Sequence, residues 1–117
     1  PVRLAVSLHA ADDELRARLV GVNGTYPLPA ILDACRAYQA AGGRRLTFEY
    51  VLVRGVNDRP AHARALAAAV RGMRAHVNLI PLNPTAGSDL QPSPPRALAL
   101  FEQTLRGCGV EFATVGP

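Results

Sequence analysis

Strand-like and helix-like segments alternate along almost the whole of this sequence. Apolar segments rich in β-branched and aromatic residues predict strands at residues 2–8, 44–53, 76–80 and 110–115. Helical spacing predicts helices from Asp12 to Gly21, from Pro29 to Gly42, from Asp58 to Gly72, and from Ser93 to Gly107, with Asp58 and Ser93 as expected caps. Strands separated by helices run parallel, so the chain predicts an α/β fold, either a doubly wound sheet or a (β/α) barrel.

The length of the chain limits how much of a barrel it can form. A barrel of eight strand–helix units needs about 250 residues, and this sequence has 117. It begins inside a predicted strand and stops directly after another. We therefore expect residues 1–117 to be a single partial (half) barrel domain with about four parallel strands, and a fragment of a longer chain.

Half a barrel would leave surfaces that a complete barrel covers. Four strands cannot close a barrel of eight, so an edge strand and the inward face with Ala5, Thr47, Val51 and Ile80 are expected to lack partners. We expect association through that edge or face, with the missing amino-terminal half or with a second copy.

Composition excludes some classes of function. No apolar stretch is long enough to cross a bilayer and no signal peptide precedes the first strand, so a cytoplasmic protein without a membrane partner is predicted. The net charge is +4, and all thirteen basic residues are arginine. Arg44-Arg45 is interpreted as a solvated corner, so charge alone does not predict nucleic-acid binding.

The two cysteines are interpreted as structural. Cys35 lies on the apolar face of a predicted helix, and Cys108 lies between two glycines in a turn. Neither has a second cysteine or a histidine at metal-ligand spacing, so no metal site is predicted.

Polar residues follow two predicted strands at the ends where α/β proteins bind ligands. Ser7 and His9 alternate with Val6 and Leu8 and therefore point to the opposite side of the first strand. Asn83 follows the strand at 76–80 and opens a loop long enough to suggest a function. Ser7, His9 and Asn83 are predicted to form one polar cluster, although backbone hydrogen bonding would also explain Ser7 and His9.

Other polar residues near strand ends have structural explanations. Glu49, in the middle of a strand, is expected to be nearly buried in a structural ion pair rather than to act as a catalytic acid. Asn57 suits a left-handed turn. A Ser7–His9 nucleophile lacks an acidic orienting group, and Gly87-Ser88 lacks the glycines of a phosphate loop, so neither is favoured and no catalytic residue is assigned.

Three segments together resemble a known family. "LAVSLHAADDELRARLV", "YPLPAILDACRAYQAAGGRRLTFEYVLVRGVND" and "HVNLIPLNPTAGSD" resemble, in this order, the carboxyl-side half of the barrel of the radical-SAM RNA adenine methyltransferases of the RlmN and Cfr family. The resemblance implies a radical-SAM barrel that methylates an adenine carbon in ribosomal RNA and, in some members, transfer RNA. By the same resemblance Ser7, Leu8, His9 and Asn83 contact S-adenosylmethionine.

The sequence departs from this family in its cysteines. The family binds a 4Fe-4S cluster through three closely spaced cysteines and uses two more in catalysis, and neither set is matched here. The span alone is therefore expected to be inactive, supplying only cofactor-pocket residues. The alternatives are a non-catalytic half-barrel that serves as a binding or assembly module, and an unrelated (β/α) enzyme with a phosphate site at Gly87-Ser88. The sequence does not identify the modified nucleotide.

Overall fold

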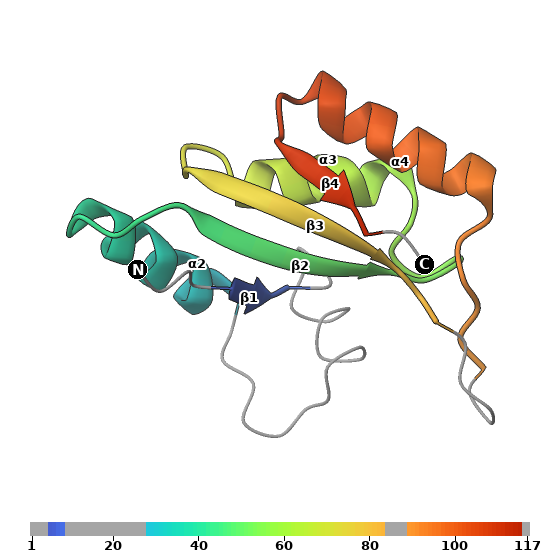
Figure 1. The fold of residues 1–117 in the computed structure, drawn as a ribbon, viewed down its shortest axis with the longest axis horizontal. Helices are drawn as coiled ribbons and strands as arrows, with labels where there is room; N and C mark the ends of the chain where they lie inside the picture. The colour runs from blue at the N-terminus through green and yellow to red at the C-terminus, as the bar shows by residue number, and fades with distance from the viewer. Residues whose placement is uncertain (1–4, 9–27, 84–88, 116–117) are drawn as a thin grey trace.

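A four-stranded parallel sheet is the centre of the computed structural model, which describes residues 5–8, 28–83 and 89–115 (Figure 1). In chain order the elements are β1 (Ala5–Ser7), α2 (Leu28–Ala40), β2 (Leu46–Leu52), α3 (Pro60–Ala69), β3 (Ala75–Pro81), α4 (Pro95–Gly107) and β4 (Phe112–Thr114). The four predicted strands and the last three predicted helices are confirmed within these residues. The helix predicted from Asp12 to Gly21 lies outside the described residues.

The order of the strands decides between the two predicted closures. The strands follow one another as β1-β2-β3-β4, and every neighbouring pair is parallel. A doubly wound sheet would reverse this order at a switch point. Steps in one direction with right-handed crossovers carry every helix to the same face. The sheet is therefore an open segment of a (β/α) barrel, as the sequence analysis predicted.

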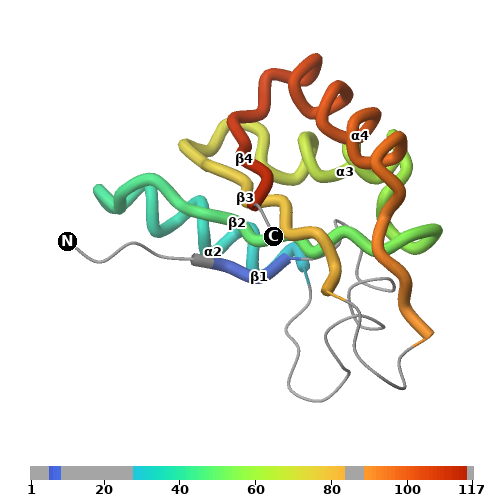
Figure 2. Tube along the Cα trace, turned by 45° about the vertical axis from the view of Figure 1, so that its right-hand side comes forward, coloured from blue at the N-terminus to red at the C-terminus, as the bar shows by residue number. Residues whose placement is uncertain are grey.

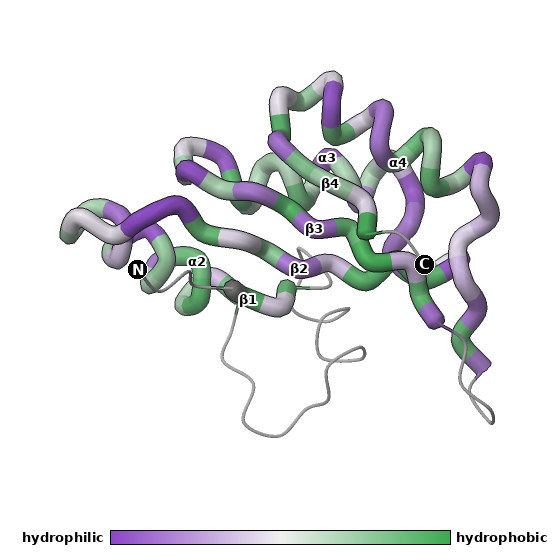
Figure 3. The backbone as a smooth tube through the Cα atoms, in the orientation of Figure 1, coloured by the Kyte–Doolittle hydropathy of each residue, from purple (hydrophilic) through white to green (hydrophobic). Residues whose placement is uncertain are grey.

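The helices share one core with one face of the sheet. Along β2 the burial alternates strictly, and Figure 3 shows apolar and polar positions interspersed along β2 and β3. The four residues of β2 that face the helices are Leu46, Phe48, Tyr50 and Leu52. The core side chains from the helices are Leu28, Leu32 and Cys35 of α2, Ala63 and Leu66 of α3, and Phe101 and Leu105 of α4. The α3 and α4 helices lie side by side over β3 and β4 (Figures 1 and 2).

Tyr50 joins this core to the turn that follows β2. Its ring packs against Phe101 with centroids 5.4 Å apart, and its hydroxyl donates a 2.9 Å hydrogen bond to the carbonyl oxygen of Asn57. Burial, and secondarily the negative charge of Asp58, raises the pKa of Tyr50 far above its ordinary value. The phenol is therefore a permanent donor to the turn.

Asn57 holds the turn after β2 with its side chain as well as its backbone. Its Oδ1 accepts a 2.8 Å hydrogen bond from the N–H of Val53, and its Nδ2 donates a 2.7 Å bond to the carbonyl of Val51. The residue is completely buried. Gly55 occupies a left-handed position in the turn, with a φ of +71°. The structural explanation of Asn57 is confirmed by its side-chain hydrogen bonds.

Asp58 has a different role from the predicted helix cap. The α3 helix has Arg59 as its N-cap, one residue later, because Pro60 occupies the first turn. The Asp58 carboxylate instead accepts hydrogen bonds from the Gly55 N–H (3.0 Å) and from the hydroxyl of Ser93 (2.8 Å). Ser93 likewise does not cap α4, whose N-cap is Pro94. A cap assigned from sequence spacing was wrong in both places, because the two side chains bind each other.

The segment before α4 therefore returns to the end of β2. The N–H of Arg54 donates a 2.8 Å hydrogen bond to the carbonyl of Gln91, and Val53 forms an isolated antiparallel bridge with Pro92. A long connection begins at Asn83. Together with the Asp58–Ser93 bond, these contacts attach its last residues to the turn after β2. We call Asn57, Asp58 and Ser93 the loop anchor.

Replacing the central side chain of the loop anchor should destabilise the fold. Asn57→Ala removes two short buried hydrogen bonds, which we expect to lower the free energy of unfolding by about 2–4 kcal/mol. Urea denaturation followed by circular dichroism measures this value. The control is Arg54→Ala, whose side chain is exposed in the same turn, with an expected change within about 0.5 kcal/mol. Equal stability of the two variants would contradict the anchoring role of Asn57.

Candidate functional site

The sheet face opposite the helices is less buried and more polar than the core face. It is formed by alternate residues of the strands, and its members from the first three strands are Ser7, Thr47, Glu49, Val51, His76, Asn78 and Ile80. None of these residues is buried, whereas their neighbours Leu8, Phe48, Val77 and Leu79 are completely buried. We call this surface the open face. In a closed barrel it would line the interior.

Ser7 and Glu49 meet on the open face. The strand register pairs Ser7 with Glu49 and Glu49 with Asn78, so the three residues form one row across the sheet. The hydroxyl of Ser7 donates a 3.5 Å hydrogen bond to Oε1 of Glu49. The described residues provide Glu49 with no ionic partner, so the structural ion pair expected from the sequence is not found among them. That expectation assumed a sheet covered on both faces, and this one is covered on one.

Leu8 lies on the other side of the sheet. Its side chain is completely buried in the helix-side core, and its N–H donates a 2.9 Å hydrogen bond to the carbonyl of Glu49. The predicted alternation of Val6, Ser7 and Leu8 is confirmed. Any contact of Leu8 with a ligand on the open face would have to come from its backbone carbonyl.

Asn83 lies beyond the carboxyl end of β3, at the same end of the sheet as Ser7. It follows the carboxyl end of β3 by two residues and is exposed. The strand register pairs Ser7 with Glu49 and Glu49 with Asn78, so Ser7 and Asn78 lie at the same height in the sheet. Asn83 is five residues further along the chain. An extended chain covers at most roughly 16 Å in that interval, which sets an upper limit on the distance between Asn83 and Asn78. His9 lies outside the described residues, and convergence of the three side chains stays a prediction.

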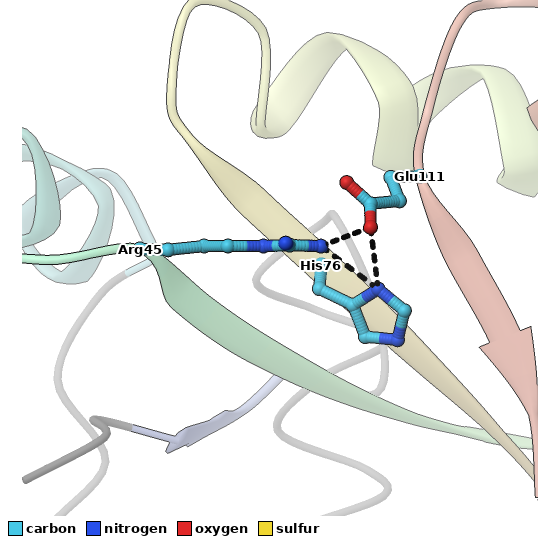
Figure 4. Close-up of polar contacts among 3 residues, drawn as sticks. All are labelled: Arg45, His76 and Glu111. Atoms are coloured by element: carbon cyan, nitrogen blue, oxygen red, sulfur yellow. Dashed lines mark hydrogen bonds and ion pairs between the residues drawn. The ribbon is translucent and has the colours of Figure 1, made fainter.

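A second polar group, which the sequence analysis missed, lies at the amino-terminal ends of the strands. Arg45 forms an ion pair with Glu111, and its Nη2 lies 3.2 Å from Nδ1 of His76 (Figure 4). His76 Nδ1 is 3.6 Å from Oε1 of the same carboxylate. The hydrogen bond from Arg45 is the main cause that lowers the pKa of Glu111. Arg45 was predicted to be part of a solvated corner, but it also forms an ion pair across the sheet. No local sequence pattern links it to the distant Glu111.

The two cysteines lie in different surroundings. Cys35 is buried in the core, where burial raises the pKa of its thiol, and Cys108 is exposed after α4. Within the described ranges, no three histidine, cysteine or acidic side chains gather in a way that could hold a metal ion. The structural interpretation of Cys35 is confirmed by its packing.

Comparison with known proteins gives closely similar relatives, each considerably longer than this chain. No family model matches the chain. A probable dual-specificity RNA methyltransferase RlmN from Parafrankia sp. (strain EAN1pec) is 54% identical over 110 residues, covering 94% of this chain and 29% of the relative. The corresponding protein of Moorella thermoacetica is 50% identical over 113 residues, covering 97% and 32%. The chain thus spans about a third of the curated relatives it matches, and the resemblance to RlmN is confirmed.

Solved structures agree with the resemblance to RlmN. A radical SAM methyltransferase from Sphaerobacter thermophilus has a TM-score of 0.92 and 48% sequence identity, covering 97% of this chain and 33% of that protein. A domain of pyruvate-formate lyase-activating enzyme from Bacteroides vulgatus has a TM-score of 0.76 at 19% identity, which shows a shared fold alone. Among the helices described, none is long and apolar enough to span a membrane.

The Arg45–Glu111 pair should contribute stability in a pH-dependent way. The pKa of Glu111 is lower in the folded chain than its ordinary value of 4.5. Its contribution is therefore fully present above about pH 4.5 and is lost as the pH falls through the folded pKa. We expect the melting temperature of Glu111→Gln to lie below that of the parent chain at pH 6 and to approach it near pH 3.

The pH series needs low salt, because an exposed pair is screened. Asp33→Asn is the control, since Asp33 is exposed and lies 4.0 Å from its partner Arg36. A difference for Glu111→Gln that is independent of pH would contradict an electrostatic role.

Proposed function

We propose that this chain, which matches about a third of each RlmN relative, is one part of an S-adenosylmethionine-dependent radical-SAM RNA methyltransferase. Its reaction would be methylation of an adenine carbon in ribosomal RNA, with transfer RNA as the second substrate class. The observation that carries the proposal is the open face: a barrel-type sheet with a polar row and two exposed candidate ligand residues at its carboxyl end. A protein that modifies these RNAs would work in the cytoplasm.

The residues at the carboxyl end suit parts of the proposed cofactor. S-adenosylmethionine is elongated, with an amino acid at one end and adenosine at the other, so it could reach both Ser7 and Asn83. A hydroxyl and an amide can each donate and accept, as the carboxylate, ribose and adenine groups require. We assign the same role to His9 and to the backbone of Leu8. The cofactor, with a 4Fe-4S cluster, supplies the radical and methyl-transfer chemistry of such enzymes.

The described residues do not fit the cluster. Cys35 is enclosed by the core, and Cys108 lies at the amino-terminal end of the sheet, away from Ser7 and Asn83. A cluster needs several thiolates close together. We therefore propose that residues 1–117 form one partial-barrel domain, that the cluster ligands belong to another part of a longer protein, and that this span alone is inactive.

Asn83→Ala tests the cofactor pocket in the full-length protein. Removing an amide that pairs with a bound ligand should weaken S-adenosylmethionine binding by about 1–3 kcal/mol, measured by isothermal titration calorimetry. Gln103→Ala is the matched control, because Gln103 is an exposed amide on α4. A dissociation constant that changes no more in Asn83→Ala than in the control would count against the pocket.

The open face and the sheet edges suggest how the domain associates. The strands β1 and β4 end the sheet, and each presents one unpaired side among the described strands. We propose that the rest of the barrel covers the open face and pairs with an edge, burying about 800 Å² or more per partner. Without it, a second copy would take that place.

Sedimentation velocity of the 117-residue span at micromolar concentration tests this association. We expect dimers or larger species, or a higher melting temperature when the remainder of the natural protein is added in trans. A stable monomer whose melting temperature is unaffected by that addition would overturn the proposal.

A further inference from the structure

A cavity lined by arginines lies at the amino-terminal end of the sheet, away from Ser7 and Asn83. Its volume is about 730 Å³, and it is formed by the starts of β2, β3 and β4 together with the ends of α3 and α4. Its charged lining residues are Arg45, Arg64, Arg71, Arg74 and Glu111. Four of the thirteen arginines therefore surround one cavity.

The single carboxylate leaves most of this positive charge uncompensated. Glu111 is already bound to Arg45 and lies close to His76 (Figure 4). Arg74 donates a 2.8 Å hydrogen bond to the carbonyl of Gly43, which holds the side chain but does not neutralise it. The described residues give Arg64 and Arg71 no acidic partner, and both are exposed. Four guanidinium groups thus face one carboxylate.

The position of α3 accounts for only part of this arrangement. A cation near the carboxyl end of a helix is favoured by the helix dipole, which would explain Arg71 alone. Arg64 comes from within α3, whereas Arg71 follows the end of the helix, and both line the cavity. Arg45 and Arg74 come from the segments before β2 and β3. Convergence of side chains from three segments points to an anion with several charged groups.

We propose that this cavity binds phosphodiester groups of the RNA backbone. Guanidinium groups form bidentate hydrogen bonds with phosphate and remain charged at every physiological pH. Contacts of this kind position a nucleic acid without reading its sequence. The choice of RNA rests on the proposed function.

The location of the cavity limits which RNA can use it. The β3 strand has seven residues, so the two ends of the sheet are roughly 20 Å apart. A short oligonucleotide bound at the carboxyl end would not reach the arginines. A folded RNA of transfer-RNA size would, so the cavity selects for a large, structured substrate.

The test measures RNA binding by the full-length protein. A fluorescein-labelled transfer RNA is titrated with the parent protein and the Arg64→Ala/Arg71→Ala double variant at several KCl concentrations, and anisotropy gives the affinity. Removal of each phosphate-binding arginine should weaken binding roughly five- to tenfold at about 0.1 M salt. The slope of log affinity against log salt should become shallower by about 0.7–0.9 for each arginine removed.

Matched variants separate phosphate binding from a general change in charge or stability. Arg36→Ala removes one charge from α2 that does not line the cavity, although Arg36 bonds to the carbonyl of Ala69, and it should change the slope by less than half as much as the double variant does. Arg64→Lys/Arg71→Lys keeps both charges and should retain most of the salt dependence. Melting temperatures of the two Arg64/Arg71 double variants should stay close to that of the parent protein, because both side chains are exposed.

Two results would overturn the proposal. One is an affinity and a salt slope in the double alanine variant that match those of Arg36→Ala. The other is a lower melting temperature with unchanged RNA affinity, which would show that the arginines bind another part of the protein. Failure of the proposed function would be distinguishable, because the parent protein would then bind no S-adenosylmethionine.

Discussion

The right-handed crossover between parallel neighbouring strands is the constraint on which the rest of this structure depends. Each described helix connects two strands that are adjacent in the sheet, and the order never reverses. All crossovers must then carry their helices to one face. That face holds the core around Phe48 and Leu79, and the other face is left for Ser7, Glu49 and Asn78. The difference between the buried face and the open face therefore follows from the connectivity of the chain.

Burial has different chemical consequences on the two faces. On the helix side, polar groups are matched closely: Tyr50 donates to the carbonyl of Asn57, and the Asn57 side chain bonds to the backbone of Val51 and Val53. An unmatched polar group there would be costly. On the open face Glu49 keeps a carboxylate in mid-strand with a single 3.5 Å hydrogen bond from Ser7.

The loop anchor connects the core to the proposed ligand site. Asp58 and Ser93 join the turn after β2 to the segment before α4, and Gln91 adds a backbone contact to Arg54. Asn83 lies at the start of the same connection, beyond β3. The anchor therefore holds the residues at the far end of that connection, from Gln91 to Ser93.

The sequence by itself determined the local pattern of this protein. Period-two alternation placed Ser7 and Leu8 on opposite faces, helical spacing identified the buried faces with Cys35 and Phe101, and glycines marked the ends of the helices. These features depend on neighbouring residues, so they can be read along the chain. The resemblance to RlmN came from the same information, because whole segments match.

Only the tertiary structure decided which distant residues meet. Asp58 accepts a hydrogen bond from Ser93 instead of capping a helix, and Arg45 forms an ion pair with the distant Glu111. Among the described residues, Glu49 lacks the ion pair that was expected for it. Each outcome depends on which segments the sheet order makes neighbours and on whether one or both faces are covered. Neither the charge nor the spacing of single residues contains that information. The arginine cavity is the clearest case, since its members are scattered along the sequence and gather only where strands begin and helices end.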